Sequence, residues 1–156
     1  MGTQEKKYRR NVAVFVLDAG GKILLCRRSD SYKAWQLPQG GMDSGETPRE
    51  AMVRELGEEI GTKDVDIIHE LEGTIRYDWP ERLKHLGFDG QEQTYFLVRL
   101  RPEATIDLNA HDPAEFEDIL WVGAGEFLAR IEGFKKEPYS VALGKLISLF
   151  PTLIAP

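Results

Sequence analysis

The sequence predicts a domain of α+β or α/β class, because short apolar runs with strand character occur together with a few amphipathic helical segments. The apolar runs are rich in β-branched residues, and one helix, over 47–60, has clear start and stop signals. The chain has 156 residues, of which 42% are hydrophobic, so it can bury one core of its own. We therefore expect residues 1–156 to form a single domain.

Five segments read as strands, namely 11–17, 22–26, 65–72, 94–100 and 119–122. The first two are separated by the turn-forming sequence at 18–21, which predicts a β-hairpin. Residues 29–45 contain Pro38 and three glycines, so we expect a loop there.

Three segments read as helices, and the clearest is 47–60. Thr47 is a suitable N-cap, Pro48 occupies the first helical position, and Glu50 completes a capping box three residues after Thr47. Gly61 supplies the left-handed residue that commonly ends a helix. Weaker patterns predict helices over 126–131 and 140–150.

Composition excludes several classes of protein. The chain has 20 lysine and arginine residues against 26 aspartate and glutamate residues, which gives a net charge of −6. Such a chain is poorly suited to hold nucleic acid by overall attraction, so an anionic substrate requires local positive charge.

The one cysteine, Cys26, excludes an internal disulfide and a multi-cysteine zinc site, and its apolar neighbours predict a packed thiol. No window reaches the ~20 apolar residues of a membrane helix, so we expect no membrane partner and a cytoplasmic location.

The helix over 47–60 places three carboxylates close together. At 100° per residue, Glu55, Glu58 and Glu59 share an arc of about 100°, beside an apolar face. Carboxylates at these spacings repel one another, and a divalent cation that prefers oxygen ligands would relieve the repulsion. The alternative is an acidic face exposed to solvent. We favour a site for Mg²⁺, with Mn²⁺ as a substitute.

The segment before this helix contains the glycine pair Gly40-Gly41. Paired glycines let a ligand approach the backbone, and N–H groups at a loop-to-helix junction suit phosphate. Such pairs mostly turn the chain, so the pair is weak evidence alone. Its position directly before a helix with clustered carboxylates suggests a metal–phosphate site.

These residues together resemble the Nudix box, G-x5-E-x7-R-E-U-x-E-E-x-G-U, with Gly40, Glu46 and the run from Arg54 to Gly61 at the fixed positions. Thr62 stands where an aliphatic residue is usual, a packing position. The resemblance implies a Nudix fold, an α/β/α sandwich with a mixed β-sheet between helices. It also implies Glu55, Glu58 and Glu59 as metal ligands, Arg54 as the residue that orients them, and a more structural role for Glu46.

The flanking segments resemble one branch of this family, the bacterial RNA 5′ pyrophosphohydrolases and the related dinucleoside polyphosphate hydrolases. The segments are 8–12, 35–41, 75–77, 90–96, 115–116 and 121–122. The branch implies Glu115 as a further metal ligand or catalytic carboxylate, although it is one acid among several in its loop. The implied substrate contacts are Arg9, Arg27, Arg28, Gly40, Gly41, Tyr77, Phe134 and Lys135. Arginines are otherwise mostly surface residues and aromatics mostly core residues, so each contact has a structural alternative.

The resemblance implies hydrolysis of a 5′-triphosphate on RNA, with release of pyrophosphate, as the step that initiates mRNA decay. Glu58 is the preferred general base, with Glu55 and Glu115 as alternatives. The alternative functions are a dinucleoside polyphosphate (diadenosine tetraphosphate) hydrolase, a nucleoside triphosphate pyrophosphatase, and a non-catalytic module that senses nucleotide. The partner is an RNA 5′ end or a nucleotide. A homodimer is compatible with the sequence, which does not determine the oligomeric state.

Overall fold

A mixed β-sheet forms the centre of the molecule in the computed structural model, which describes residues 5–84 and 87–156. The strands are β1 (Tyr8–Leu17), β2 (Ile23–Arg28), β3 (Trp35–Gln36), β4 (Gln39–Gly41), β5 (Val65–Glu70), β6 (Ile75–Asp78), β7 (Gly90–Leu100) and β8 (Phe116–Val122). Within the described residues the sheet has the order β3-β2-β1-β7-β5, with β4 paired to β1, β6 to β7 and β8 to β2. The pair β1–β7 is parallel and the other pairs are antiparallel, so the sheet is mixed, as the resemblance implied.

Strand β1 lies in the middle of the sheet and is buried on both faces. Its side chains alternate, so that Val12, Val14 and Val16 join one apolar cluster, while Ala13, Phe15 and Leu17 join the other. A strand covered on both sides reads in the sequence as a continuous apolar run, which explains the pattern of 11–17.

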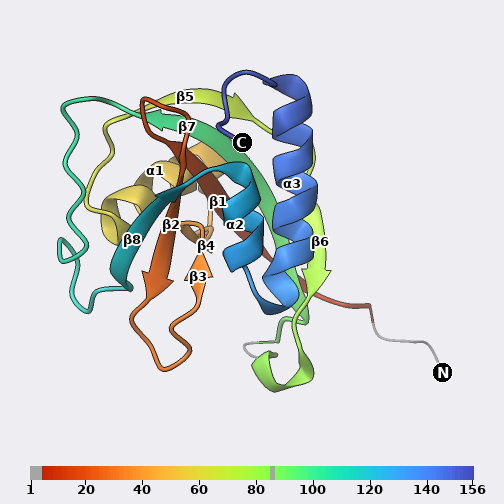
Figure 1. The fold of residues 1–156 in the computed structure, drawn as a ribbon. Helices are drawn as coiled ribbons and strands as arrows, with labels where there is room; N and C mark the ends of the chain where they lie inside the picture. The colour runs from red at the N-terminus through yellow and green to blue at the C-terminus, as the bar shows by residue number, and fades with distance from the viewer. Residues whose placement is uncertain (1–4, 85–86) are drawn as a thin grey trace.

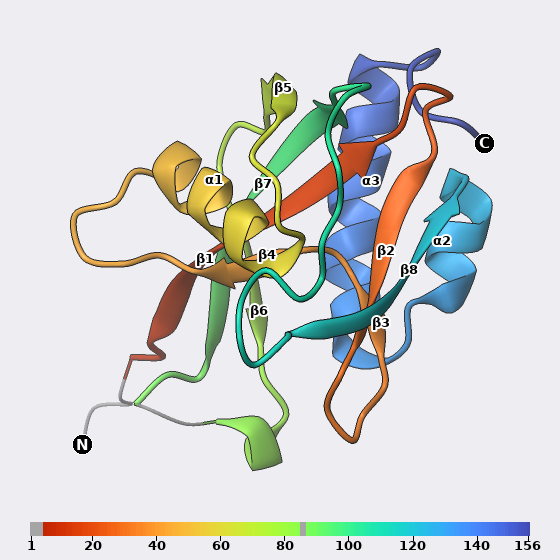
Figure 2. The same ribbon diagram turned by 90° about the vertical axis from the view of Figure 1, so that its left-hand side faces the viewer.

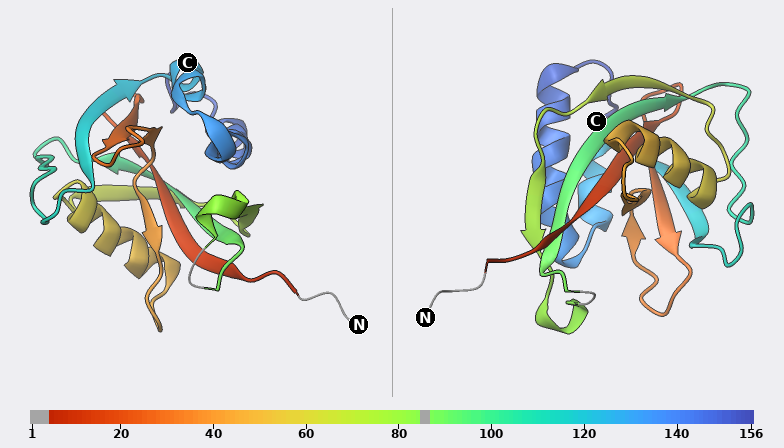
Figure 3. Two further views of the ribbon diagram at one scale, coloured as in Figure 1. Left: turned by 90° about the horizontal axis from the view of Figure 1, so that it is seen from below. Right: turned by 180° about the vertical axis from the view of Figure 1, so that it is seen from behind.

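The helices cover the two faces unequally. Helix α1 (Pro48–Glu59) packs on one face, and α2 (Ala124–Arg130) and α3 (Lys136–Leu149) pack on the other. Figures 1 and 2 show this arrangement of helix, sheet and helices, and the two views of Figure 3 confirm that α1 and α3 lie on opposite sides of β1 and β7. The predicted layers are therefore confirmed.

The ends of α1 are formed as the sequence predicts. Thr47 Oγ1 accepts a hydrogen bond from the N–H of Glu50 at 3.2 Å, and the Glu50 side chain accepts one from the N–H of Thr47 at 3.3 Å. Gly61 follows the helix with φ +74°, the left-handed conformation that glycine adopts without strain. The helix that carries the three carboxylates is thus fixed by its own local sequence.

The predicted hairpin is correct only at its turn. Strands β1 and β2 pair at Leu17 and Ile23 and then diverge, and β2 instead runs antiparallel to β8 along its length. Strand β1 takes β7 and β4 as its neighbours. Because β8 lies far downstream of β2 in the sequence, hairpin rules could not indicate this pairing.

Three other predictions needed correction. The expected loop at 29–45 contains the short strands β3 and β4, and β4 pairs with β1 over Asn11–Ala13. Strand β6 was not predicted, because its four residues owe their conformation to pairing with β7. Helix α3 begins at Lys136 rather than at 140, since Pro138 falls in the first turn, where its missing N–H breaks no helical bond.

The expectation of a packed thiol at Cys26 is confirmed. Cys26 is fully buried, and burial raises the pKa of its thiol, so it is a packed, unreactive residue. Among the described residues, no helix combines the length and the apolar character needed to cross a membrane.

Candidate functional site

The two glycines of β4 lie directly against charged side chains. A methyl group added at Gly40 would lie 2.1 Å from Cδ of Glu55, and one added at Gly41 would lie 2.1 Å from Nη2 of Arg9. Both distances are far below van der Waals contact, so only glycine leaves room for these side chains. The glycine pair thus does permit close approach, and in this structure the approaching groups are a carboxylate and a guanidinium.

Arg54 connects the start of α1 to two of the clustered carboxylates. Its guanidinium donates to Glu46 at 2.7 and 2.9 Å, to Glu55 Oε1 at 2.9 Å and to Glu58 Oε2 at 3.4 Å. It also donates to the carbonyl of Gly41 at 2.9 Å. The hydrogen bonds from Arg54 lower the pKa of Glu46 to about 2, so this ion pair persists at any physiological pH. Arg54 therefore contacts two of the three glutamates that the resemblance implied it would orient.

Glu55 and Glu59 form a buried pair of carboxylates. Their exposed fractions are 9% and 4%, and their side chains are hydrogen-bonded to each other. Burial raises the pKa of both groups, and most strongly that of Glu59, because a carboxylate without water is costly. In the absence of a cation the pair is expected to share one proton. The N–H of Gln39 donates to Glu59 Oε2 at 3.3 Å and partly offsets this effect.

This pair fits a hard divalent cation. Its donors are oxygen atoms only, and a cation would replace the shared proton and neutralise two buried charges. Glu58 is about two-fifths exposed, and it accepts a hydrogen bond from the same Arg54 nitrogen as Glu55, at the longer distance of 3.4 Å. In the parts of the chain that the structure describes, no three His, Cys, Asp or Glu side chains are gathered in a metal-binding arrangement. The preformed part of the site is therefore the pair Glu55–Glu59. Glu58 is the residue directly before Glu59 on α1.

Glu115 reaches the same region from the loop that precedes β8. Its carboxylate raises the pKa of Glu59, which shows that the two charges lie within electrostatic range of each other. The loop is held to the end of β2, because the main-chain N–H of Ser29 donates to the carbonyl of Glu115 at 3.0 Å. The fold thus brings together Glu115 and the box helix, which are far apart in the sequence.

A pair of cations lies beside these carboxylates. Lys135 Nζ donates to Gln36 Oε1 at 2.6 Å, and Arg28 Nη1 donates to the same oxygen at 3.3 Å. Burial, together with the charge of Arg28, lowers the pKa of Lys135 to about 8. Arg28 is also paired with the carboxylate of Asp30, whereas the described contacts give Lys135 no carboxylate partner, so the charge of Lys135 is available for a phosphate oxygen.

The remaining predicted contacts are distributed around this centre. Arg27 lies over the ring of Trp35, 5.9 Å from its centroid, and forms an ion pair with Glu117 at 3.2 Å. The rings of Tyr77 and Phe134 are in contact, with centroids 6.0 Å apart. The Tyr77 hydroxyl donates to a buried glutamine at 2.5 Å, so this residue also supports the protein interior.

Sequence reasoning missed the amide side chains that hold the site together. Gln36 links Arg28 to Lys135, and Gln39 accepts a hydrogen bond from the hydroxyl of Tyr139 in α3. The available signal was the pair of glutamines within the otherwise apolar or glycine-rich segment 35–41. Polar side chains in such a segment generally require a buried partner.

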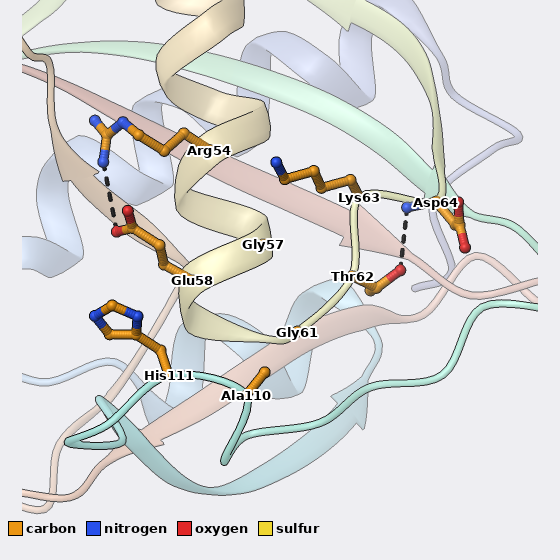
Figure 4. A pocket seen from close by; sticks show the side chains of 9 residues that line it. All are labelled: Arg54, Gly57, Glu58, Gly61, Thr62, Lys63, Asp64, Ala110 and His111. Atoms are coloured by element: carbon orange, nitrogen blue, oxygen red, sulfur yellow. Dashed lines mark hydrogen bonds and ion pairs between the residues drawn. The ribbon is translucent and has the colours of Figure 1, made fainter.

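A separate open cavity of about 520 Å³ lies along the opposite side of α1 from the buried pair. It runs over Gly57, with Arg54, Glu58 and His111 on one side and Lys63 on the other (Figure 4). The stem of Lys63 packs where a side chain at Gly57 would stand, since a methyl group there would lie 2.6 Å from Cε of Lys63. Glu58 thus borders both this cavity and the carboxylate cluster.

Comparison with known proteins agrees with this geometry. The sequence pattern of the NUDIX domain matches residues 7–142. The chain belongs to the NUDIX family. Members of the family use divalent metal ions, which is consistent with the carboxylate pair on α1.

Two relatives that match most of the chain are both named RNA pyrophosphohydrolase. The chain is 42% identical to the RNA pyrophosphohydrolase of a Nitratiruptor species over 146 residues, which is 90% of this chain and 94% of the relative. It is 46% identical to the RNA pyrophosphohydrolase of Campylobacter jejuni (serotype O:2) over 141 residues, 86% of this chain and 90% of the relative.

Solved structures support the fold. The dihydroneopterin triphosphate pyrophosphohydrolase of E. coli matches with a TM-score of 0.69 and 21% identity, over 85% of this chain and 94% of that one. The Ap4A hydrolase of C. elegans matches with a TM-score of 0.64 and 19% identity, over 88% of this chain and 98% of that one. At these identities the likeness shows the NUDIX fold and no particular substrate.

Proposed function

We propose that this chain is an RNA 5′ pyrophosphohydrolase that converts 5′-triphosphate RNA to 5′-monophosphate RNA, with Mg²⁺ or Mn²⁺ as the cofactor. The observation that carries the proposal is the buried pair Glu55–Glu59 beside the cations Arg28 and Lys135. A triphosphate has several negative charges, and this juxtaposition offers both a cation site and direct donors for its oxygens. Similarity over about nine-tenths of the chain to relatives named RNA pyrophosphohydrolase supports the same reaction.

The metal site of the proposal consists of Glu55 and Glu59 with Glu58 and Glu115 as additional oxygen donors. A divalent cation held there supplies charge neutralisation and acidifies a bound water. Arg54 keeps Glu55 and Glu58 in position through the hydrogen bonds described above. Gly40 and Gly41 keep the backbone open, so that Glu55 and Arg9 remain at the edge of the site.

In the chemical step, the oxygen of water attacks a phosphorus atom of the triphosphate and the bond to the leaving pyrophosphate breaks. Glu58 is the proposed base that takes the proton of this water, because it is the most exposed of the three box glutamates. Arg28 and Lys135 bind phosphate oxygens and hold the charge that shifts to the leaving group. Arg27, Tyr77 and Phe134 are the proposed contacts for the first nucleotides.

Product analysis on 5′-labelled triphosphorylated RNA tests the proposed reaction. We expect release of pyrophosphate and a 5′-monophosphate product in the presence of Mg²⁺, with lower kcat/KM on diadenosine tetraphosphate and on free GTP. A higher kcat/KM on either small substrate would instead identify a dinucleoside polyphosphate hydrolase or a nucleoside triphosphate pyrophosphatase. No magnesium-dependent release from any of the three would identify a nucleotide-sensing module.

The assignment of the base has its own test. Glu58→Gln keeps the shape of the side chain and its hydrogen bond from Arg54 but removes the ability to accept a proton, so we expect kcat to fall roughly 100-fold or more at saturating Mg²⁺. Turnover within threefold of wild type would transfer the role to Glu55 or Glu115. The kcat values of Glu55→Gln and Glu115→Gln, measured in the same way, show which of the two residues takes that role.

The same proposal includes three properties of the whole protein. We propose a single catalytic domain over 1–156, a role in initiating mRNA decay, and a cytoplasmic location, where RNA with 5′-triphosphate ends is made in bacteria. Light scattering of the purified chain tests the homodimer that the sequence allows.

A further inference from the structure

The connection between β2 and β3 presents an exposed aromatic ring. Tyr32 is 63% exposed, more than any other large hydrophobic side chain that the described residues leave at the surface. Single exposed hydrophobic residues are common and need no explanation by themselves. Tyr32 differs because its surroundings are ordered and charged, as the next contacts show.

The loop that carries Tyr32 is held at several points. The carboxylate of Asp30 accepts hydrogen bonds from the main-chain N–H of Tyr32 at 3.1 Å and from Arg28 Nε at 2.8 Å. Lys33 Nζ donates to Glu117 Oε2 at 2.9 Å, and Ser29 is bonded to the loop that carries Glu115. An ordered loop loses little conformational entropy when its tip binds a ligand.

One face of Tyr32 lies beside a cation of the candidate site. The guanidinium carbon of Arg28 lies 6.0 Å from the centroid of the Tyr32 ring. Arg28 shares the side-chain oxygen of Gln36 with Lys135, as described above. Lys135 Nζ in turn lies 6.0 Å from the ring of Phe134.

These contacts form one continuous surface feature, which we name the aromatic–cationic strip. Its members are Tyr32, Arg28, Lys135, Phe134 and Tyr77. In Figure 1 the β2–β3 connection, the start of α3 and the lower end of β6 lie towards the same end of the molecule, consistent with this continuity. Aromatic rings interleaved with cations are the typical surface for unpaired nucleic acid, because bases stack on rings while cations follow the phosphates.

The strip extends beyond the residues that are proposed to contact the 5′-triphosphate. Arg28 and Lys135 lie within electrostatic range of Glu115, whereas the described contacts link Tyr32 to the carboxylates of the site through Arg28. In the proposed function a nucleoside triphosphate or a first nucleotide would engage the inner part of the strip. The exposed ring of Tyr32 would then serve a substrate that continues as a chain.

From this geometry we infer that Tyr32 stacks on a downstream, unpaired base of the RNA and so contributes to the preference for RNA over small nucleotides. The inference rests on the proposed function and adds a residue that discriminates between substrates by length. It also explains how a chain with net charge −6 holds RNA, since attraction is concentrated on one strip rather than spread over the surface.

The test compares substrates of two lengths with matched variants. Triphosphorylated RNAs of two and of eight nucleotides are hydrolysed by wild type, Tyr32→Ala and Tyr32→Phe, with Leu149→Ala as a control that removes a similarly exposed side chain from α3. We expect Tyr32→Ala to lower kcat/KM about tenfold on the eight-nucleotide RNA, mainly through KM. We expect no change on the dinucleotide, and near wild-type values for Tyr32→Phe and Leu149→Ala.

Two results would overturn the inference. Equal losses on both RNAs would indicate a structural role for the loop, and no loss on the longer RNA would show that Tyr32 does not contact it. Failure of the wild type to hydrolyse either RNA would refute the proposed function instead. In that case the inference about Tyr32 is tested by fluorescence anisotropy, which measures binding without turnover. The affinities of wild type and Tyr32→Ala are compared for 5′-monophosphate RNAs of the same two lengths. Absence of a length-dependent loss for Tyr32→Ala there refutes the inference.

Discussion

The main-chain N–H of Gln39 donates a hydrogen bond to Oε2 of Glu59 at 3.3 Å. This bond joins β4 to a buried carboxylate of α1, and the Gln39 side chain is held in turn by the hydroxyl of Tyr139 from α3. A residue on one face of the sheet thus fixes the strand that supports a box glutamate on the other. The position of Glu59 therefore depends on all three layers of the fold.

Removal of the Tyr139 hydroxyl should affect catalysis through Gln39. In Tyr139→Phe the partly buried amide oxygen of Gln39 loses its donor, which costs about 0.5–1.5 kcal/mol of stability and frees β4 to shift. We expect kcat to fall about tenfold with KM nearly unchanged, because small displacements of catalytic groups are costly. Steady-state kinetics on triphosphorylated RNA and thermal unfolding measure the two effects.

Tyr95→Phe is the matched control for that variant. It removes another buried hydroxyl, which donates to Gln93, a residue with no contact to a box glutamate among those described. We expect a similar loss of stability and little loss of kcat. Equal losses of kcat in the two variants would show that general destabilisation, and not Gln39, accounts for the effect.

Substitution of Gly40 should inactivate the protein without unfolding it. The added methyl group of Gly40→Ala would lie within 2.3 Å of the Glu55 carboxylate, so that side chain must leave its position. We expect kcat to fall roughly 100-fold or more, with weaker metal affinity and an unchanged circular dichroism spectrum. Isothermal titration with Mn²⁺ measures the loss of affinity.

Gly144→Ala is the control for this substitution. Gly144 lies in α3 with open space around it, so alanine should stabilise the helix by about 0.5–1 kcal/mol and leave kcat unchanged. Full activity of Gly40→Ala would contradict the arrangement of Gly40 and Glu55 described here.

Metal binding should release a proton from the buried pair. Because burial raises the pKa of Glu55 and Glu59, the metal-free pair holds a proton to a higher pH than a free carboxyl does, and a divalent cation displaces that proton. Titration calorimetry with Mn²⁺ in two buffers of different ionisation enthalpy should show net release of protons on metal binding. Glu59→Gln should abolish this release and weaken binding.

The same pair predicts how stability varies with pH in EDTA. The folded protein keeps a proton that the unfolded chain loses above a pH of about 4.5, so the free energy of unfolding should fall as pH rises from there towards the raised pKa. The Tm of Glu59→Gln should vary less with pH over the same range. A metal-free wild type whose Tm rises from pH 5 to 7 would rule out the shared proton.

Lys135 should make substrate binding sensitive to alkaline pH. Its pKa, lowered to about 8 by burial and by Arg28, means that the ammonium loses its proton as pH rises through 8. We expect KM for triphosphorylated RNA to rise above pH 8, and Lys135→Arg, which stays charged, to flatten this dependence. A pH profile of KM from 6.5 to 9.5 measures it.

Replacement of Lys135 should also stabilise the protein. The partly buried ammonium is costly below pH 8, so Lys135→Met should raise Tm at pH 7 while it raises KM. Between pH 8 and 10.5 the unfolded chain holds the proton that the folded protein has lost, so wild-type stability from this group should rise with pH. A lower Tm for Lys135→Met at pH 7 would show that the ammonium is well compensated.

The sequence by itself determined the helix of the box and the chemistry it presents. Thr47, Glu50 and Gly61 act on their own neighbours, and the spacing of Glu55, Glu58 and Glu59 follows from the helical repeat alone. These are local interactions, so local patterns predict them, and the match to the family pattern then covered most of the chain.

Only the tertiary structure decided which of these groups are buried and what holds them. It left Glu58 exposed while it buried the pair Glu55–Glu59, and it placed Arg28 and Lys135 on one oxygen of Gln36. Burial and long-range pairing join segments as far apart as Gln39 and Tyr139, 100 residues from each other, which no local pattern specifies. The pKa shifts of Glu55, Glu59 and Lys135 arise from that burial, and they are therefore a property of the fold.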